Sequence, residues 1–155
     1  MMVMAATKCT PMRNVAVDVW HCDSQGVYSG YAGAAVSPNH VTPVNQLTFF
    51  RGTQTTDANG RCVFTTIVPG WYTGRAVHIN VKAHPTATSQ AITQLYFPED
   101  LLATVFAADP YSGHAGAHVP FDQDGLSTAA KGPAPLKLTK SGAGYATSFT
   151  LGIAS

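Results

Sequence analysis

Four side chains in the sequence are of types that can bind a hard metal ion: Tyr28, Tyr72, His78 and Asn80. His78 and Asn80 flank Ile79. Side chains two residues apart on a strand lie on one face, so a His-x-His pair at this spacing chelates an ion, although here the second position is asparagine. The two tyrosines could add phenolate oxygens, which suit Fe(III). Residue types alone do not establish such a site.

Two strands are predicted around these residues from the alternation of apolar and polar side chains. The alternation covers residues 15–20 and 77–82. A period of two is typical of β-strands, because successive side chains point to opposite faces of the sheet. His78 and Asn80, in the second run, are therefore expected to share one face.

The tyrosines are expected on loops. Tyr28 follows the turn cluster Asp23–Gly26, and Tyr72 lies in the glycine- and proline-rich break Pro69–Gly74. Such residues favour turns and interrupt strands. Residues 32–46 contain two prolines and no periodicity, so we interpret them as a loop that could lie over the site.

The other elements are predicted from composition and turn residues. Further strands are expected at residues 47–51, 62–68, 91–97, 136–138 and 145–153. The turn Asp57–Gly60 predicts a hairpin that includes residues 62–68, and Ser141–Gly144 predicts a terminal hairpin. Pro98 and the acids after it predict one short helix to Ala107. Residues 109–135 have no dependable period and are expected to be irregular.

Composition indicates one small domain and excludes several kinds of partner. The chain has 155 residues, of which 11% are charged, and a formal net charge of +1. This length suits a single domain, and no basic stripe is present to neutralise phosphates, so nucleic acid is not expected as a partner. Met1–Ala6 is apolar but too short to span a bilayer and lacks the features of a signal peptide. We therefore expect no membrane partner and, for the chain as given, a cytoplasmic location.

Three segments resemble one enzyme family. Asp18–Tyr28, Phe50–Gly52 and Pro69–Ile79 are similar to segments of the intradiol ring-cleavage dioxygenases, especially their small members that consist of the catalytic domain alone. The resemblance spans about Cys9–Ile153. It implies an all-β fold, a β-sandwich of the intradiol dioxygenase type with one short helix and long irregular loops. Residues 1–155 would form a single domain that lacks the usual amino-terminal extension of the family.

The resemblance implies a set of iron ligands. Tyr28, Tyr72 and His78 match three ligands of Fe(III) in the family, and the family has a second histidine where this chain has Asn80. An amide oxygen is a neutral, weak donor, whereas imidazole binds iron well. Asn80 is therefore expected to be a weak or lost ligand, and the site to bind Fe(III) less tightly.

The resemblance also implies residues that act on the substrate. Arg75 and Gln94 match the family's arginine and glutamine beside the bound catechol, and Tyr72 would act as a general base. These three are the expected catalytic residues. Tyr28, Trp71, Arg75 and Gln94 are the expected substrate-binding residues.

Three functions remain open on this basis. The first is cleavage of a catechol-type ring with non-haem Fe(III) and O2. The second is a metal-independent cyclase or isomerase that acts on a phenolic or polyketide-like natural-product intermediate in the same pocket, which Asn80 favours. The third is an inert aromatic-binding module, which the presence of Arg75 disfavours. In each case the partner is a small aromatic or phenolic molecule, and a second copy of the chain could complete the pocket in a homo-oligomer.

Each candidate residue also has a purely structural interpretation. His78 could be a hydrogen-bonded core histidine, Arg75 a surface charge and Gln94 a residue that bonds across strands. His21 and His84 are weak candidates to replace the missing ligand.

The three cysteines leave the cellular location open. Cys9 and Cys22 resemble a disulfide pair of secreted relatives, which would fit a secreted protein whose amino terminus is truncated here. Cys62 is expected to be a small core residue.

Overall fold

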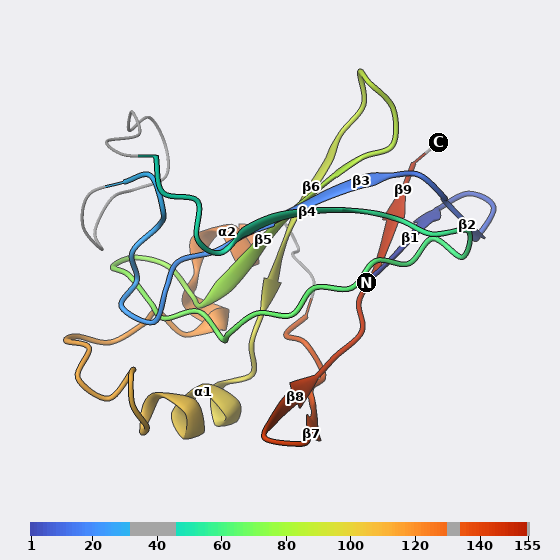
Figure 1. Cartoon of the computed structure of the whole chain (residues 1–155). Coiled ribbons are helices and arrows are strands. Elements are labelled where there is room, and N and C mark those ends of the chain that lie inside the picture. Colours follow the sequence, from blue (N-terminus) through green and yellow to red (C-terminus); the bar gives the residue numbers. More distant parts are fainter. Residues whose placement is uncertain (32–45, 130–133, 155) are drawn as a thin grey trace.

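The computed structural model describes residues 1–31, 46–129 and 134–154, and most of its regular elements are β-strands (Figure 1). The strands are β1 (Met2–Ala5), β2 (Thr10–Pro11), β3 (Ala16–Trp20), β4 (Arg51–Thr55), β5 (His78–His84), β6 (Ala91–Tyr96), β7 (Thr139–Ser141), β8 (Gly144–Ala146) and β9 (Thr150–Ile153). The helical elements are α1 (Glu99–Phe106), the 3-10 turn η1 (Phe121–Gln123) and α2 (Gly125–Ala129). The expected all-β class is confirmed.

The central sheet is antiparallel and has the strand order β4-β3-β5-β6. Its inner strands β3 and β5 confirm the predictions made from alternation at residues 15–20 and 77–82, and β6 confirms the strand predicted at residues 91–97. In the register of the sheet, Asn80 lies opposite Trp20 on one side and opposite Gln94 on the other. The polar side chains of Asn80 and Gln94 are therefore neighbours on one face of the sheet, next to Trp20.

The opposite face of the central sheet forms the main hydrophobic core. Val17 and Val81, both fully buried, pack with Val3 and Leu151 from the two chain ends. These ends form a second sheet in the order β2-β1-β9, in which β1 and β9 are parallel. In Figure 1 the blue strand β1 and the red strand β9 accordingly lie side by side.

A second core cluster holds helix α1 against the end of the central sheet. Pro98 precedes the helix, and Glu99 and Asp100 occupy its first turn, where acidic side chains favour a helix start. Leu101 and Leu102 are buried in this cluster. The predicted short helix is therefore confirmed.

The strand predicted at residues 47–51 is wrong in position. Phe50 has a φ of +53°, and the strand β4 begins only at Arg51. All five residues of β4 are exposed, because it is the edge strand of the central sheet. Its pairing with β3, and not an apolar pattern of its own, makes this segment a strand.

The strand predicted at residues 62–68 is also wrong, although the turn before it is correct. The Asp57 carboxylate accepts from the backbone N–H groups of Asn59 and Arg61, 2.8 Å from each, which closes the expected turn. Residues 62–68 form no strand. β-Branched residues favour an extended chain, but a strand also needs a ladder of backbone hydrogen bonds, and after the turn the Cys62 N–H donates to the Met1 carbonyl oxygen at 3.0 Å instead of continuing along β4.

The carboxy-terminal prediction is correct only in part. The hairpin around residues 141–144 exists as β7 and β8, but residues 136–138 form no strand and β9 leaves the hairpin to pair with β1. The region 109–135, expected to be irregular, contains η1 and α2. The loop predicted at residues 32–46 lies, except for its last residue, outside the described residues.

The suggested disulfide between Cys9 and Cys22 is not formed. Cys9 is exposed, whereas Cys22 and Cys62 are buried, and all three are free thiols. The Cys22 thiol lies 3.5 Å from the carbonyl oxygen of Gly70, to which it donates. Burial raises the pKa of Cys22 to about 12, so this thiol is inert.

No helix among the described residues has the length and apolar character needed to cross a bilayer.

Candidate active site

Two glycine-rich turns carry Tyr28 and Tyr72 and are packed directly against each other. Gly26 has a φ of +76°, and a Cβ atom there would lie 2.0 Å from the carbonyl oxygen of Trp71. A Cβ atom on Gly70 would lie 2.3 Å from a backbone oxygen of the first turn. Only glycine permits such close approach of two backbones. These contacts therefore set the distance between the turns that carry the two tyrosines.

His78, the first residue of β5, is held in one tautomer. Its Nδ1 atom lies 2.7 Å from the carbonyl oxygen of Ala76. A carbonyl only accepts, so Nδ1 carries the proton and Nε2 keeps a free electron pair. Burial lowers the pKa of His78 to about 4, so the ring is neutral at about pH 7. A neutral imidazole fixed in this way by a backbone carbonyl is typical of metal-binding histidines.

The two tyrosine oxygens converge on the free nitrogen of His78. Its Nε2 atom lies 3.5 Å from Tyr28 Oη and 3.5 Å from Tyr72 Oη. The tyrosine rings meet edge to face with centroids 5.7 Å apart. All three side chains are buried, and burial raises the pKa of both tyrosines. In the metal-free protein the phenols are therefore protonated, and binding of a cation would be coupled to loss of their protons.

This donor set fits Fe(III). Two phenol oxygens and a neutral imidazole nitrogen from three separate segments meet at one point, and hard oxygen donors favour a hard ion. Within the described part of the chain, no group of three or more His, Cys, Asp and Glu side chains offers another metal site.

Asn80 lies beside Tyr28 and directs its nitrogen, not its oxygen, toward the phenol. Asn80 Nδ2 lies 3.2 Å from Tyr28 Oη and 3.2 Å from the carbonyl oxygen of Trp20. Asn80 Oδ1 accepts from Gln94 Nε2 at 2.9 Å. The side chain of Asn80 is therefore part of a hydrogen-bond network that includes Gln94.

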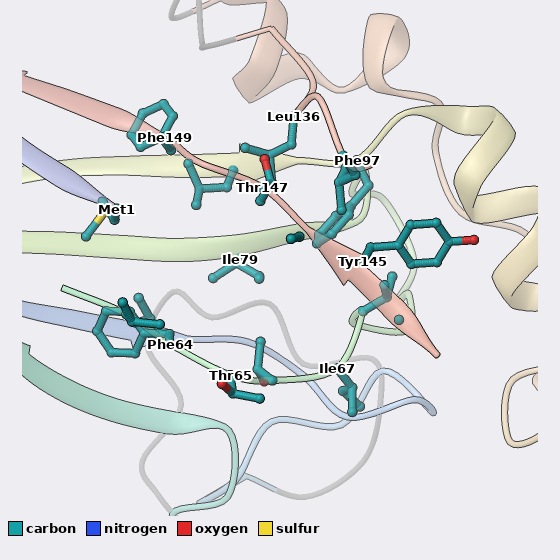
Figure 2. Close-up of a pocket in the computed structure, with 18 of the residues that line it drawn as sticks. Met1, Phe64, Thr65, Ile67, Ile79, Phe97, Leu136, Tyr145, Thr147 and Phe149 are labelled. Carbon is teal, nitrogen blue, oxygen red and sulfur yellow. The ribbon is translucent and has the colours of Figure 1, made fainter. Parts of the chain in front are cut away.

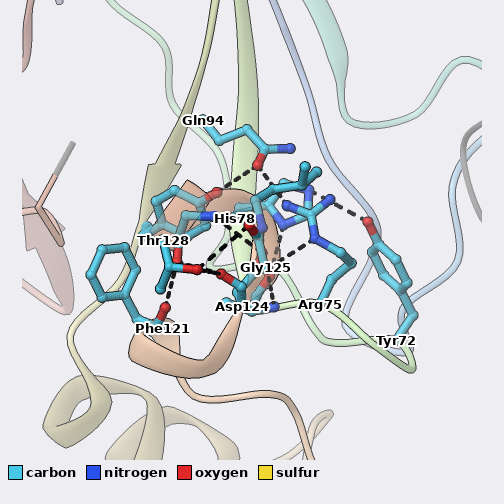
Figure 3. Close-up of polar contacts among 12 residues, drawn as sticks. Tyr72, Arg75, His78, Gln94, Phe121, Asp124, Gly125 and Thr128 are labelled. Atoms are coloured by element: carbon cyan, nitrogen blue, oxygen red, sulfur yellow. Dashed lines mark hydrogen bonds and ion pairs between the residues drawn. The ribbon is translucent and has the colours of Figure 1, made fainter. Parts of the chain in front are cut away.

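Arg75 lies at the other end of this network, where Asp124 holds it (Figure 3). Arg75 Nε donates to Asp124 Oδ2 at 2.9 Å, and Arg75 Nη2 donates to Gln94 Oε1 at 2.6 Å. The Tyr96 hydroxyl donates to the same Gln94 oxygen at 2.6 Å. The side chain of Asp124 is fully buried, and that of Arg75 is 14% exposed. The guanidinium is therefore fixed on two sides, beside Tyr72 and Tyr96.

Asp124 was missed by the sequence analysis. Its carboxylate also accepts from the backbone N–H groups of Ala76, Leu126 and Ser127. Burial alone would raise the pKa of Asp124, but these hydrogen bonds and Arg75 lower it, so the group is ionised. An aspartate just before a helix is a common N-cap, which was the available signal. Arg75 and Asp124 are 49 residues apart in the chain, so no local sequence signal indicated that they would form a contact.

Trp71 lies among core residues. Its ring packs on Phe106, with centroids 4.5 Å apart, and on His114, at 4.2 Å. It belongs to the buried cluster that contains Leu102. Its expected role in substrate binding stays a prediction.

The two other histidines near the motifs have partners of their own. His21 donates through Nδ1 to the carbonyl oxygen of Cys22, and its Nε2 accepts from the Thr66 hydroxyl. His78 is the first residue of β5 and His84 the last, and His84 pairs there with Asp18. In the described structure neither is recorded in contact with the two tyrosines.

A pocket of about 630 Å³ lies on the other face of the central sheet (Figure 2). Val19, Ile79 and Leu95 line it from the strands, and the segment 63–68 and the carboxy-terminal hairpin complete it. Its lining is mostly apolar and contains none of the tyrosine, histidine and arginine residues of the cluster. The groups able to do chemistry are therefore on the face that carries His78.

Comparison with known proteins identifies relatives of this chain. A family model described as dioxygenase matches residues 3–116. The chain is similar to an intradiol ring-cleavage dioxygenase from Tetranychus urticae, with 26% identity and a TM-score of 0.87 over 99% of this chain and 77% of that chain. It is also similar to the dioxygenase domain of a dioxygenase carbohydrate-binding protein fusion from Streptomyces sp. SirexAA-E, with 27% identity, a TM-score of 0.67 and coverage of 99% and 75%.

A more distant structure shares the fold. The 3-chlorocatechol 1,2-dioxygenase from Rhodococcus opacus is 24% identical, with a TM-score of 0.56 over 96% of this chain and 56% of that chain. A search of curated proteins gave no match. The family model covers most of the chain, and the structural matches span nearly all of it. The chain belongs to the intradiol ring-cleavage dioxygenase family.

Proposed function

We propose that the protein cleaves a catechol-type ring with Fe(III) and O2, using Tyr28, Tyr72 and His78 as ligands. The observation that carries this proposal is the convergence of two phenol oxygens on His78 Nε2, 3.5 Å from each. The interpretation of His78 as a purely structural core histidine does not explain this convergence, because among the described residues Nε2 has just these two long contacts. When bound, Fe(III) would withdraw electron density from a catechol and so make the ring reactive toward dioxygen.

The surrounding residues would act on the substrate directly. Tyr72 Oη, once free of other partners, would accept a proton from a catechol hydroxyl. The Arg75 guanidinium, fixed by Asp124 and Gln94, would stabilise negative charge on the ring without having to reorganise. Gln94 would help to position the substrate beside Asn80. The product would be a muconic-type diacid that contains both atoms of O2.

The relatives support a choice of substrate class. One structural relative is described as a 3-chlorocatechol 1,2-dioxygenase and another as an intradiol ring-cleavage dioxygenase. A vicinal diphenol is therefore the class of substrate to test first.

The test is iron loading followed by a catechol assay. Fe(III)-phenolate pairs absorb visible light, so the reconstituted protein should be coloured, bind about one iron per chain and change colour when catechol is added without oxygen. Oxygen uptake and a muconic-type product should follow when air is admitted. Tyr72→Phe is the matched control and should lose most of the colour. A colourless protein that holds no iron after reconstitution would contradict the proposal.

A second candidate function is a metal-independent reaction in the same pocket. The observation that favours it is the Asn80 nitrogen, which faces Tyr28 where the family has a histidine ligand. Arg75 and the phenols could then bind a phenolic intermediate and move its protons in a cyclisation or isomerisation. Conversion of such a compound by metal-free protein under nitrogen would identify this function. Tight binding of aromatic compounds without turnover would instead identify an inert binding module.

A further inference from the structure

We propose that Asn80 is a hydrogen-bond donor to the Tyr28 oxygen and not a metal ligand, so that the protein supplies three ligands instead of four. The proposal deepens the function proposed above, because it assigns the role of the residue at which this chain departs from the family. It rests on the direction of each hydrogen bond around the side chain.

The first fixed direction comes from the backbone of β3. Asn80 lies opposite Trp20 in the sheet, and its amide lies 3.2 Å from the Trp20 carbonyl oxygen. A carbonyl can only accept, so the group facing it must be the NH2 of Asn80. The same NH2 lies 3.2 Å from Tyr28 Oη. The Asn80 oxygen must therefore point away from Tyr28.

The second fixed direction comes from Arg75. A guanidinium has no acceptor, so the Gln94 atom 2.6 Å from Arg75 Nη2 must be the amide oxygen. The Gln94 NH2 therefore points to Asn80 and donates to its Oδ1 at 2.9 Å. Reversing either amide would set two donors or two acceptors against each other. Both ends of the network thus require the Asn80 nitrogen at Tyr28.

The resulting chain of donors runs from Arg75 through Gln94 and Asn80 to the Tyr28 oxygen. A positive charge at its start polarises the two amides in the same direction, and aligned hydrogen bonds strengthen one another. A donor on a phenolate oxygen lowers the electron density that this oxygen gives to a metal. Asn80 would therefore weaken Tyr28 as a ligand, and one more coordination position would be free for a chelating substrate.

A double-mutant cycle in the metal-free protein tests the hydrogen bond itself. The variants are Asn80→Leu, Tyr28→Phe and the double variant, compared by thermal unfolding. We expect the loss of Tm caused by Asn80→Leu to fall to about half or less in the Tyr28→Phe background, because residues in direct contact couple. Additive losses would overturn the proposal. Should Asn80→Leu not fold, Asn80→Ala takes its place in the same cycle.

The control cycle pairs Asn80→Leu with Tyr72→Phe. Asn80 has no direct hydrogen bond to Tyr72 and reaches it only through Tyr28, so the coupling in this cycle should be clearly smaller than that with Tyr28. Coupling as large as that with Tyr28 would overturn the proposal, because it would indicate a general disturbance of the site.

A spectroscopic test in the Fe(III)-loaded protein addresses the effect on the metal. Removal of the donor in Asn80→Leu should move the phenolate-to-iron absorption band to longer wavelength, because the Tyr28 oxygen gives up its electrons more easily. An unmoved band would overturn the tuning role even if the cycle shows the hydrogen bond. If the wild-type protein binds no iron, the function proposed above fails, whereas the metal-free cycle still decides whether Asn80 donates to Tyr28.

Discussion

Replacing Asp124 with alanine should destabilise the protein strongly and release Arg75 from its position in the candidate active site. Asp124 is fully buried and accepts from Arg75 Nε and from three backbone N–H groups. Removing one partner of a buried ion pair costs about 3–5 kcal/mol, and losing an aspartate N-cap costs about 1 kcal/mol. The two losses overlap because they involve one carboxylate, so we expect a decrease of about 4 kcal/mol in the free energy of unfolding.

Asp124→Asn separates charge from capping. Asparagine is as good an N-cap as aspartate, so this variant should keep the start of α2. Its NH2 would replace the oxygen that accepts from Arg75 Nε and from the Ala76 N–H, and losing these two hydrogen bonds should cost about 3 kcal/mol. In the iron-loaded enzyme its kcat/KM for a catechol should fall more than its stability would explain.

Urea unfolding, followed by circular dichroism, measures these differences. The control is Asp18→Ala. Asp18 pairs with His84 across the central sheet, but unlike the Arg75–Asp124 pair both side chains are 35% exposed. An exposed pair of this kind contributes at most about 1 kcal/mol. If Asp124→Ala unfolds within about 1 kcal/mol of wild type, the ion pair does not have the role that its burial implies.

Three further predictions concern the tyrosine and histidine cluster. Asn80→His should raise iron affinity by about 10-fold or more, as measured by competition with a chelator, and no gain would count against a ligand position at residue 80. The pKa of His78 is about 4 instead of 6.5, so between these values the unfolded chain binds a proton that the folded chain does not. The metal-free protein should therefore lose up to about 3 kcal/mol of stability as pH falls through this window. Urea unfolding across this pH range should show that the free energy of unfolding depends less steeply on pH in His78→Leu than in wild type. An unchanged pH dependence would refute the assignment. Gly70→Ala would place a Cβ atom 2.3 Å from a backbone oxygen of the neighbouring turn. It should therefore lower the free energy of unfolding by about 1–3 kcal/mol and weaken iron binding. A stable variant with normal iron affinity would show that the spacing of the turns is not critical.

The local alternation of apolar and polar residues was sufficient to predict the inner strands β3 and β5 and to place His78 and Asn80 on one face of the sheet. A period of two is a property of the segment itself, so it can be recognised without knowledge of the neighbouring strands. Pro98 and the acidic residues after it likewise indicated helix α1. The motifs around Tyr28 and Tyr72 pointed to the cluster because their glycine, proline and aromatic residues occur in a characteristic order.

Elements that depend on their neighbours could not be predicted in this way. The edge strand β4 has no apolar alternation, and it is a strand because β3 offers an open edge. Residues 62–68 have strand-forming side chains but do not pair with the outer side of β4. The parallel pairing of β1 with β9 joins the two ends of the chain. Backbone pairing of this kind is decided by which segments are adjacent in space.

The candidate site likewise has features that the sequence determines and features that depend on the tertiary structure. The amino-acid sequence by itself determines that residue 80 is an asparagine and that Tyr28, His78 and Arg75 lie in segments that resemble one enzyme family. It does not determine which end of the Asn80 amide faces Tyr28, or that Asp124 holds Arg75. The direction of an amide is set by the donors and acceptors around it, and in this protein those partners come from separate strands and a distant helix start. Only the tertiary structure brings them together.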